Sequence, residues 1–288
     1  MQQPNWIFAF ASVIGNSHIS ENIPCQDFCN VENYENFSIA IVCDGAGTCK
    51  NSHIGSKQVA EFSLYHFEKL IKSEKWDSGI ELPSQDIWHS AAKNTLFLIK
   101  EDLFRFSLSN DIDFKSMSCT VIVTIALQKG LLVTHIGDGR AGYCNMNDEW
   151  LPSIIPFHGE LANQTVFITS DIWSDEIIDM YVESKVIDEE VKAFCLLSDG
   201  CERATFECNL LNEETKTYFD PNKPYAPFFD PNIKNLNQLY KENKTQVEIN
   251  ELWGNFLTKG NEKLLLEPDD KSLIFGVRYF EESQTDKA

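Results

Sequence analysis

Short runs of apolar and β-branched residues recur along the chain and predict most of its strands. Each run is bounded by polar or turn-forming residues, which is typical of a strand buried on at least one face. The predicted strands are Trp6–Ile14, Phe37–Cys43, Cys119–Leu127, Leu131–Ile136, Val166–Thr169, Ala193–Leu197 and Ser272–Phe280.

Two long helical patterns lie between the second and third predicted strands, and a third spans about 233–257. In each, apolar residues recur at steps of three and four along one face, as expected for helices that lie on a sheet. The first two series are Ala60, Leu64, Phe67 and Ile71, then Trp88, Ala92, Thr95, Ile99, Leu103 and Phe106. Strand-rich halves around a helix pair, with a strand at the end, predict an α+β sandwich.

The segment 205–232 differs from its surroundings because it combines four prolines with several phenylalanines. Such a composition favours an ordered loop pinned to the surface over a flexible linker. At 288 residues, the chain is consistent with one large domain, so we interpret 1–288 as a single domain with an insert at about 205–232.

Composition disfavours nucleic-acid binding, a disulfide or zinc framework, and membrane association. Lys and Arg number 24 against 44 Asp and Glu, a net charge of −20, and no basic cluster of the kind that binds nucleic acid is visible. The nine cysteines are scattered and mostly flanked by apolar residues, which favours reduced thiols in a cytoplasmic protein over disulfides or zinc. The apolar stretch near residue 10 is too short to span a membrane, so no membrane association is expected.

Aspartates stand at the ends of several predicted strands, usually beside glycine. Asp44 opens Asp44-Gly45-Ala46-Gly47, Asp138 precedes Gly139, Asp199 precedes Gly200, and Asp269 comes just before the last strand. One Asp-Gly pair is most simply a tight turn. Four at separate strand ends converge if the strands lie side by side, and such carboxylates repel one another unless cations neutralise them. Oxygen ligands favour Mg²⁺, Mn²⁺ or Ca²⁺ over zinc.

Five short motifs in order resemble those of the PP2C-type (PPM) metal-dependent protein phosphatases, in a bacterial-like branch. They cover residues 8–278, nearly the whole chain, and each lies in the strand context expected for that family. The matching segments are Cys25-Gln26-Asp27, Asp44-Gly45-Ala46-Gly47, Gly137-Asp138-Gly139-Arg140, Ser198-Asp199-Gly200 and Asp269-Asp270-Lys271-Ser272.

The resemblance implies a four-layer α-β-β-α sandwich of two antiparallel sheets flanked by helices. It also implies two Mn²⁺ or Mg²⁺ ions, with a weaker third, and hydrolysis of phosphoserine and phosphothreonine esters by a metal-bridging water. By this resemblance Asp44, Asp199 and Asp269 activate the water. The implied metal ligands are Asp27, Asp44, the Gly45 carbonyl, Asp138, Asp199 and Asp269, with Gln26 possible.

Three positions depart from the family pattern. Gln26 stands where many members have a glutamate ligand, and Arg203 stands where animal members have a third-site aspartate, for which Glu202 is the alternative. Asn22 occupies the place of a phosphate-binding arginine. His18 is the candidate phosphate ligand instead, with a structural role for this side chain left open.

Two other classes remain to be weighed. The altered positions keep open a catalytically silent relative that binds a partner protein through the same fold. A cysteine-dependent phosphatase is disfavoured because no cysteine is followed about six residues later by arginine. The family further implies a phosphoprotein substrate, an opposing Ser/Thr kinase and a monomeric enzyme.

Overall fold

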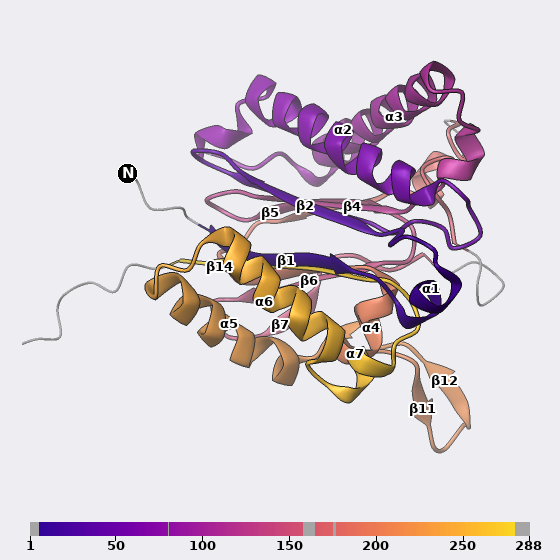
Figure 1. The fold of residues 1–288 in the computed structure, drawn as a ribbon. Helices are drawn as coiled ribbons and strands as arrows, with labels where there is room; N and C mark the ends of the chain where they lie inside the picture. Colours follow the sequence, from indigo (N-terminus) through magenta and orange to yellow (C-terminus); the bar gives the residue numbers. More distant parts are fainter. Residues whose placement is uncertain (1–5, 80, 158–164, 175–176, 280–288) are drawn as a thin grey trace, which may run out of the picture.

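The computed structural model describes residues 6–79, 81–157, 165–174 and 177–279, and two five-stranded antiparallel sheets dominate it (Figure 1). The first sheet has the order β1-β14-β9-β6-β7: Trp6–Val13, Lys271–Arg278, Val191–Leu197, Arg140–Asn145 and Trp150–Pro152. The second has the order β2-β3-β4-β5-β8: Phe28–Asn33, Ser38–Cys43, Val121–Ala126, Leu131–Ile136 and Glu183–Ile187.

Helix pairs cover the outer face of each sheet (Figure 1). Helices α2 (Ser52–Ser73) and α3 (Gln85–Ser109) pack on the second sheet, and α5 (Ala226–Lys241) and α6 (Gln246–Lys259) pack on the first. The α2 and α3 residues expected on the buried face are buried, among them Phe67, Trp88 and Ile99, except for Leu64 and Phe106, which are half-buried. The predicted α+β, four-layer sandwich is therefore confirmed.

A third apolar cluster fills the space between the two sheets. The inward residues of both sheets meet there, and the ring of Phe194 contacts Trp6 and Phe8 edge-on at centroid distances of 5.0 and 5.9 Å. Both faces of each sheet are thus covered, which explains why strands such as β4 and β5 are continuous apolar runs without polar alternation.

One predicted strand is wrong. Residues 166–169 form a turn, in which Ile168 N donates to Cys119 O at 3.0 Å and the Ile168 side chain enters the core under α3. The apolar pattern correctly predicted burial in this segment. The buried residues belong to a loop, however, and not to a strand paired in a sheet. The strands β2, β6, β7 and β8 were not predicted.

The expected loop at 205–232 is largely regular structure, which corrects that prediction. It contains β10 (Phe206–Glu207), β13 (Lys223–Pro224) and an exposed hairpin of β11 (Leu210–Asn212) and β12 (Thr217–Phe219). From Ala226 onward it is helix α5, with Pro227 in the first turn, where proline is tolerated, and Pro231 inside. The third helical region is accordingly two helices, because Thr245 and Glu248 form a capping box that starts α6.

Short helical segments complete the described chain. They are α1 (Asn16–Glu21), α4 (Glu202–Thr205), α7 (Glu262–Leu266) and the 3₁₀ turns η1 (Trp76–Ser78), η2 (Phe114–Met117), η3 (Ile178–Met180) and η4 (Asp199–Cys201). Within the described residues, no helix has the length and apolar character that crossing a bilayer requires. All nine cysteines are free thiols.

Candidate metal centre

The predicted carboxylates lie at one end of the sandwich. In the first sheet, Leu197 pairs with both Arg140 and Leu273, so the end of β9 and the starts of β6 and β14 share an edge. In the second sheet, Cys43 pairs with Phe28, which places the end of β3 beside the start of β2. The antiparallel topology thereby gathers the five segments that carry Asp27, Asp44, Asp138, Asp199 and Asp269.

The loop after β3 is fixed by backbone hydrogen bonds to the segment before β4. Thr120 N donates to Asp44 O at 2.8 Å, and Ala46 N donates to Ser118 O at 3.0 Å. Between these bonds, Gly45 passes so close to the Gln26 backbone that a Cβ would lie 2.4 Å from Gln26 O. Only glycine fits this position, so Gly45 brings the first and second motifs together.

Mutual repulsion and burial dominate the electrostatics of Asp44 and Asp199. Burial raises the pKa of Asp44 well above its usual range, and the charges of Asp27, Asp199, Asp138 and Asp269 raise it further. Burial, Asp138 and Asp269 raise the pKa of Asp199 to about 7, although a hydrogen bond with Asp44 opposes the rise. These carboxyl groups are therefore close enough to act on one another, and each disfavours the ionised form of its neighbours.

Asp27 is buried and belongs to a hydrogen-bonded chain that crosses between the sheets. Ser198 Oγ donates to Asp27 Oδ2 at 2.7 Å and accepts from Ser272 N at 2.9 Å. Burial raises the pKa of Asp27 to about 8; the Ser198 bond lowers it, and the Asp270 and Asp199 charges raise it. The two serines of the SDG and DDxS motifs thus position the acidic residue of the first motif.

The side-chain nitrogen of Gln26 is hydrogen-bonded, whereas its side-chain oxygen is bonded to no described residue. Its Nε2 donates to Cys49 O at 3.2 Å, and its backbone oxygen accepts from Ser56 Oγ at 2.6 Å. Gln26 Oε1, in contrast, is buried without a hydrogen-bond partner among the described residues. A buried acceptor of this kind is costly unless a donor or cation meets it, and this supports Gln26 as an oxygen ligand.

Asp270 is an anchoring residue that the sequence did not single out. Its side chain is 2% exposed, and it accepts hydrogen bonds from Gly15 N at 2.7 Å and Gln26 N at 2.5 Å. His18 Nδ1 lies 3.0 Å from Asp270 Oδ2. Asp270 therefore ties the first motif to the last, and His18 is directed to this carboxylate through Nδ1. The phosphate contact of His18 stays a prediction.

Arg140 has the structural role that its burial suggests. Its guanidinium, 1% exposed, donates to Glu202 at 2.9 Å, Asp220 at 2.7 Å and Asn222 at 2.8 Å. Glu202 is therefore held by Arg140 through Oε2, and Arg203 is exposed, while a third-site role for Glu202 stays a prediction. The Arg140 bonds also join the start of β6 to the segment that follows the β11–β12 hairpin.

The buried thiols near the site offer no competing chemistry. Burial raises the pKa of Cys29 to about 12, and it also raises the pKa values of Cys25, Cys43 and Cys195 above their usual range. Such thiols remain protonated at neutral pH, whereas nucleophiles and zinc ligands act as thiolates.

The donor chemistry of this end of the molecule fits hard divalent cations. Its available groups are carboxylates, the amide oxygen of Gln26 and backbone carbonyls, the set that Mg²⁺ and Mn²⁺ prefer. Within the described ranges, no group of three or more His, Cys, Asp or Glu side chains is arranged to hold a metal ion. The carboxylates share an electrostatic environment without forming a closed coordination shell.

Comparisons with known proteins identify the family and the relatives that this chain resembles. The "Protein phosphatase 2C" family model matches residues 14–248. Serine/threonine-protein phosphatase 3 of Escherichia coli is 27% identical over 281 residues, 95% of this chain and 98% of that protein. A crystal structure of a bacterial serine phosphatase superposes with a TM-score of 0.57 at 15% identity, covering 98% of this chain and 100% of that one. The Streptococcus agalactiae serine/threonine phosphatase gives 0.55 at 13%, covering 95% and 100%. This chain belongs to the protein phosphatase 2C family.

Proposed function

We propose that the carboxylate cluster is the catalytic centre of a serine/threonine protein phosphatase that works with two Mn²⁺ or Mg²⁺ ions. The observation that carries the proposal is the set of mutually repelling aspartates around Asp44, which range from the buried Asp27 to the exposed Asp269. Gln26 Oε1, which has no hydrogen-bond partner among the described residues, adds to it. Asp44, Asp199, Asp269 and the Gly45 carbonyl are the proposed inner ligands, with Asp27, Asp138 and Gln26 around them.

The protein groups have distinct proposed tasks. Asp44 and Asp199 supply the negative charge that holds cations, and Ser198 and Ser272 keep Asp27 oriented toward them. Asp270 accepts a hydrogen bond from Gln26 N and lies at an ion-pair distance from His18. In this proposal, both residues line the approach to the cluster from the segment before β2. When bound, divalent cations supply Lewis-acid polarisation of the phosphoryl oxygens and lower the pKa of a bound water.

The test is a phosphatase assay with p-nitrophenyl phosphate and a phosphothreonine peptide in Mn²⁺, Mg²⁺, Ca²⁺ or EDTA. Asp44→Asn is expected to lower kcat by at least about 100-fold, because it removes the charge at the centre of the cluster. Asp111→Asn is the matched control, since Asp111 is exposed and its left-handed φ of 53° suits asparagine. Metal-dependent turnover that survives in Asp111→Asn and fails in Asp44→Asn supports the proposal.

The silent, partner-binding relative is the competing function, and family membership does not favour it. It requires folded protein that shows no turnover with any of the three cations. We further propose that the enzyme acts as a monomer in the cytoplasm, opposite a Ser/Thr kinase. The nine free thiols support this compartment.

A further inference from the structure

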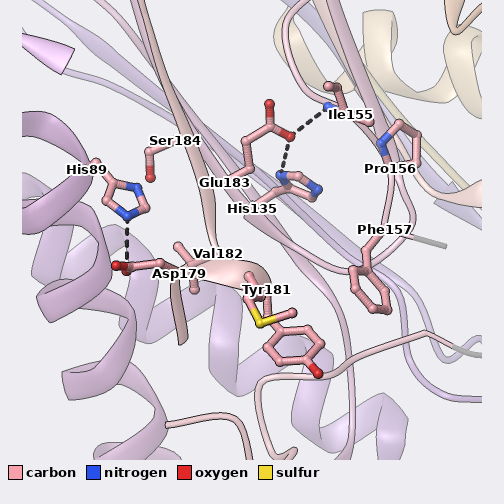
Figure 2. Close-up of a pocket in the computed structure, with 11 residues that line it drawn as sticks. His89, His135, Ile155, Pro156, Phe157, Asp179, Tyr181, Val182, Glu183 and Ser184 are labelled. Atoms are coloured by element: carbon pink, nitrogen blue, oxygen red, sulfur yellow. Dashed lines mark hydrogen bonds and ion pairs between the residues drawn. The ribbon is translucent and has the colours of Figure 1, made fainter. Parts of the chain in front are cut away.

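A pocket of about 520 Å³ lies at the β8 edge of the second sheet, between α3, η3 and the segment 155–157 (Figure 2). This volume is within the range of cavities that bind ligands or side chains. Phe157 N donates to Gly137 O at 2.9 Å, so one wall is attached to the turn that carries Asp138. The pocket, here called the β8 pocket, thus adjoins the candidate metal centre through this turn but contains none of its carboxylates.

Two hydrogen-bond acceptors without a shared donor face each other in the β8 pocket. His135 and Glu183 are cross-strand partners on β5 and β8, and His135 Nδ1 lies 3.8 Å from Glu183 Oε2, too far for a hydrogen bond. The His135 side chain is buried, and its Nδ1 has no hydrogen-bond partner in the described part of the chain. Burial lowers the pKa of His135 to about 4, so the ring is neutral at neutral pH.

The charges in the β8 pocket favour a cationic occupant. Asp179 at the rim is already paired with His89 at 3.2 Å and Lys93 at 2.5 Å. The Glu183 carboxylate accepts a hydrogen bond from Ile155 N at 2.7 Å. Burial raises the pKa of Glu183, while this bond and the charge of Lys185 oppose the rise. A positively charged N–H donor placed beside Glu183 gives this carboxylate an ionic partner, and it also gives His135 Nδ1 a donor in the tautomer that has its proton on Nε2.

The walls suit an aliphatic stem. Ile155 and Met180 are each 71% exposed at the rim, and the rings of Phe157 and Tyr181 stand 5.3 Å apart between centroids. Figure 2 shows these rings on one side of the pocket and His89 with Asp179 on the other. Apolar and aromatic walls around an acidic floor are the complement of a lysine or arginine, whose methylenes pack while the head group binds charge.

We propose that the β8 pocket binds a lysine or arginine side chain of the phosphoprotein substrate and thereby selects phosphosites that have a basic residue nearby. The proposal rests on the proposed phosphatase function and adds a substrate class to it. The net charge of −20 favours encounter with such basic segments.

The experiment compares phosphothreonine peptides that carry a single arginine at each position around the phosphothreonine with peptides that carry glutamine there. The readout is the ratio of kcat/KM for the arginine peptide to that for the glutamine peptide, measured for each enzyme. At one or two positions the wild-type ratio is expected to be about 10. Glu183→Gln, which keeps an acceptor for Ile155 N, is expected to bring the ratio close to 1, mainly through KM.

Glu190→Gln is the matched control because it removes the same charge from an exposed position just beyond β8. It is expected to retain the wild-type ratio. A wild-type ratio near 1 at every position overturns the pocket proposal, and so does a preference that persists in Glu183→Gln. Turnover of p-nitrophenyl phosphate separates the phosphatase proposal from the pocket proposal. If it occurs without an arginine preference, only the pocket proposal fails. If no substrate is turned over, both proposals fail.

Discussion

At the scale of single residues, we propose that Gln26 sets how much negative charge the candidate metal centre carries. Its Oε1 is buried and has no hydrogen-bond partner in the part of the chain that the structure describes, and Glu has the same shape with one added charge. Gln26→Glu is expected to lower the Mn²⁺ concentration for half-maximal activity about tenfold. It is also expected to lower the Tm in EDTA, because another carboxylate joins Asp27 and Asp44. Metal titration by calorimetry and by turnover checks this, with the exposed Gln128→Glu as control; an unchanged titration would contradict the ligand role.

Two roles of His18 can be tested separately: a stabilising contact with Asp270 and a contact with phosphate. Its Nδ1 is 3.0 Å from Asp270 Oδ2 at an ion-pair distance but makes no hydrogen bond within the described residues, so His18→Gln is expected to reduce the free energy of unfolding by at most about 1 kcal/mol. If Nε2 also contacts phosphate, KM for p-nitrophenyl phosphate rises while kcat changes little. Denaturant unfolding beside steady-state kinetics separates these effects. Normal stability together with normal KM would remove His18 from both roles.

At the scale of elements, Arg140 fixes the β11–β12 region to the strand that follows Asp138. Arg140→Met leaves the partly buried Glu202 and Asp220 without this cation, and breaking such a pair costs about 3 kcal/mol of stability. The hairpin is expected to become sensitive to limited proteolysis, since a two-stranded ribbon is marginal alone. The exposed pair of Lys216 and Glu213 is the comparison: Lys216→Gln is expected to change neither Tm nor cleavage.

Sequence periodicity predicted the elements whose own residues follow an apolar pattern. It failed for elements whose conformation depends on pairing with a neighbouring strand. Strands β3, β4, β5 and β9 are mostly apolar and buried almost throughout, and α2 and α3 have one apolar face, so each pattern is local. Strand β2, with sequence Phe-Cys-Asn-Val-Glu-Asn, is a strand because β3 pairs with it. Local composition does not contain this information.

The same distinction applies to the site. Asp44, Asp138, Asp199 and Asp269 were predicted because each follows or precedes a recognisable strand, whereas Asp27 precedes the unpredicted β2 and came only from the family resemblance. The anchoring role of Asp270 depends on Gly15 and Gln26, which are 255 and 244 residues away in the sequence. The pairing of Arg140 with Asp220 and Asn222 likewise depends on how the 205–232 segment folds. Contacts of this range come only from the three-dimensional arrangement.

At the scale of the whole molecule, the carboxylate cluster links folding stability to pH and to metal. The pKa values of Asp27 and Asp199 are raised to about 8 and about 7, so the folded protein binds more protons than the unfolded chain above their ordinary values near 3.8. Stability from these groups is therefore complete at low pH and is lost as the pH rises through the folded pKa values.

This linkage predicts opposite effects of pH with and without cations. Between pH 6.5 and 8.5 the Tm in EDTA is expected to fall, because Asp27 and Asp199 ionise against their neighbours. His135, whose folded pKa is lowered to about 4, adds a smaller opposing rise that is confined to the lower end of this range, where the unfolded histidine loses its proton. Cations that bind the ionised cluster release its protons and stabilise the folded state, so the Tm increase from Mn²⁺ should grow over the same range. Thermal unfolding at three pH values with EDTA or Mn²⁺ measures both trends. A metal-free Tm that rises toward pH 8.5 would show that these carboxylates are not held protonated by burial, and Asp44→Asn, which removes the central charge, should flatten both slopes.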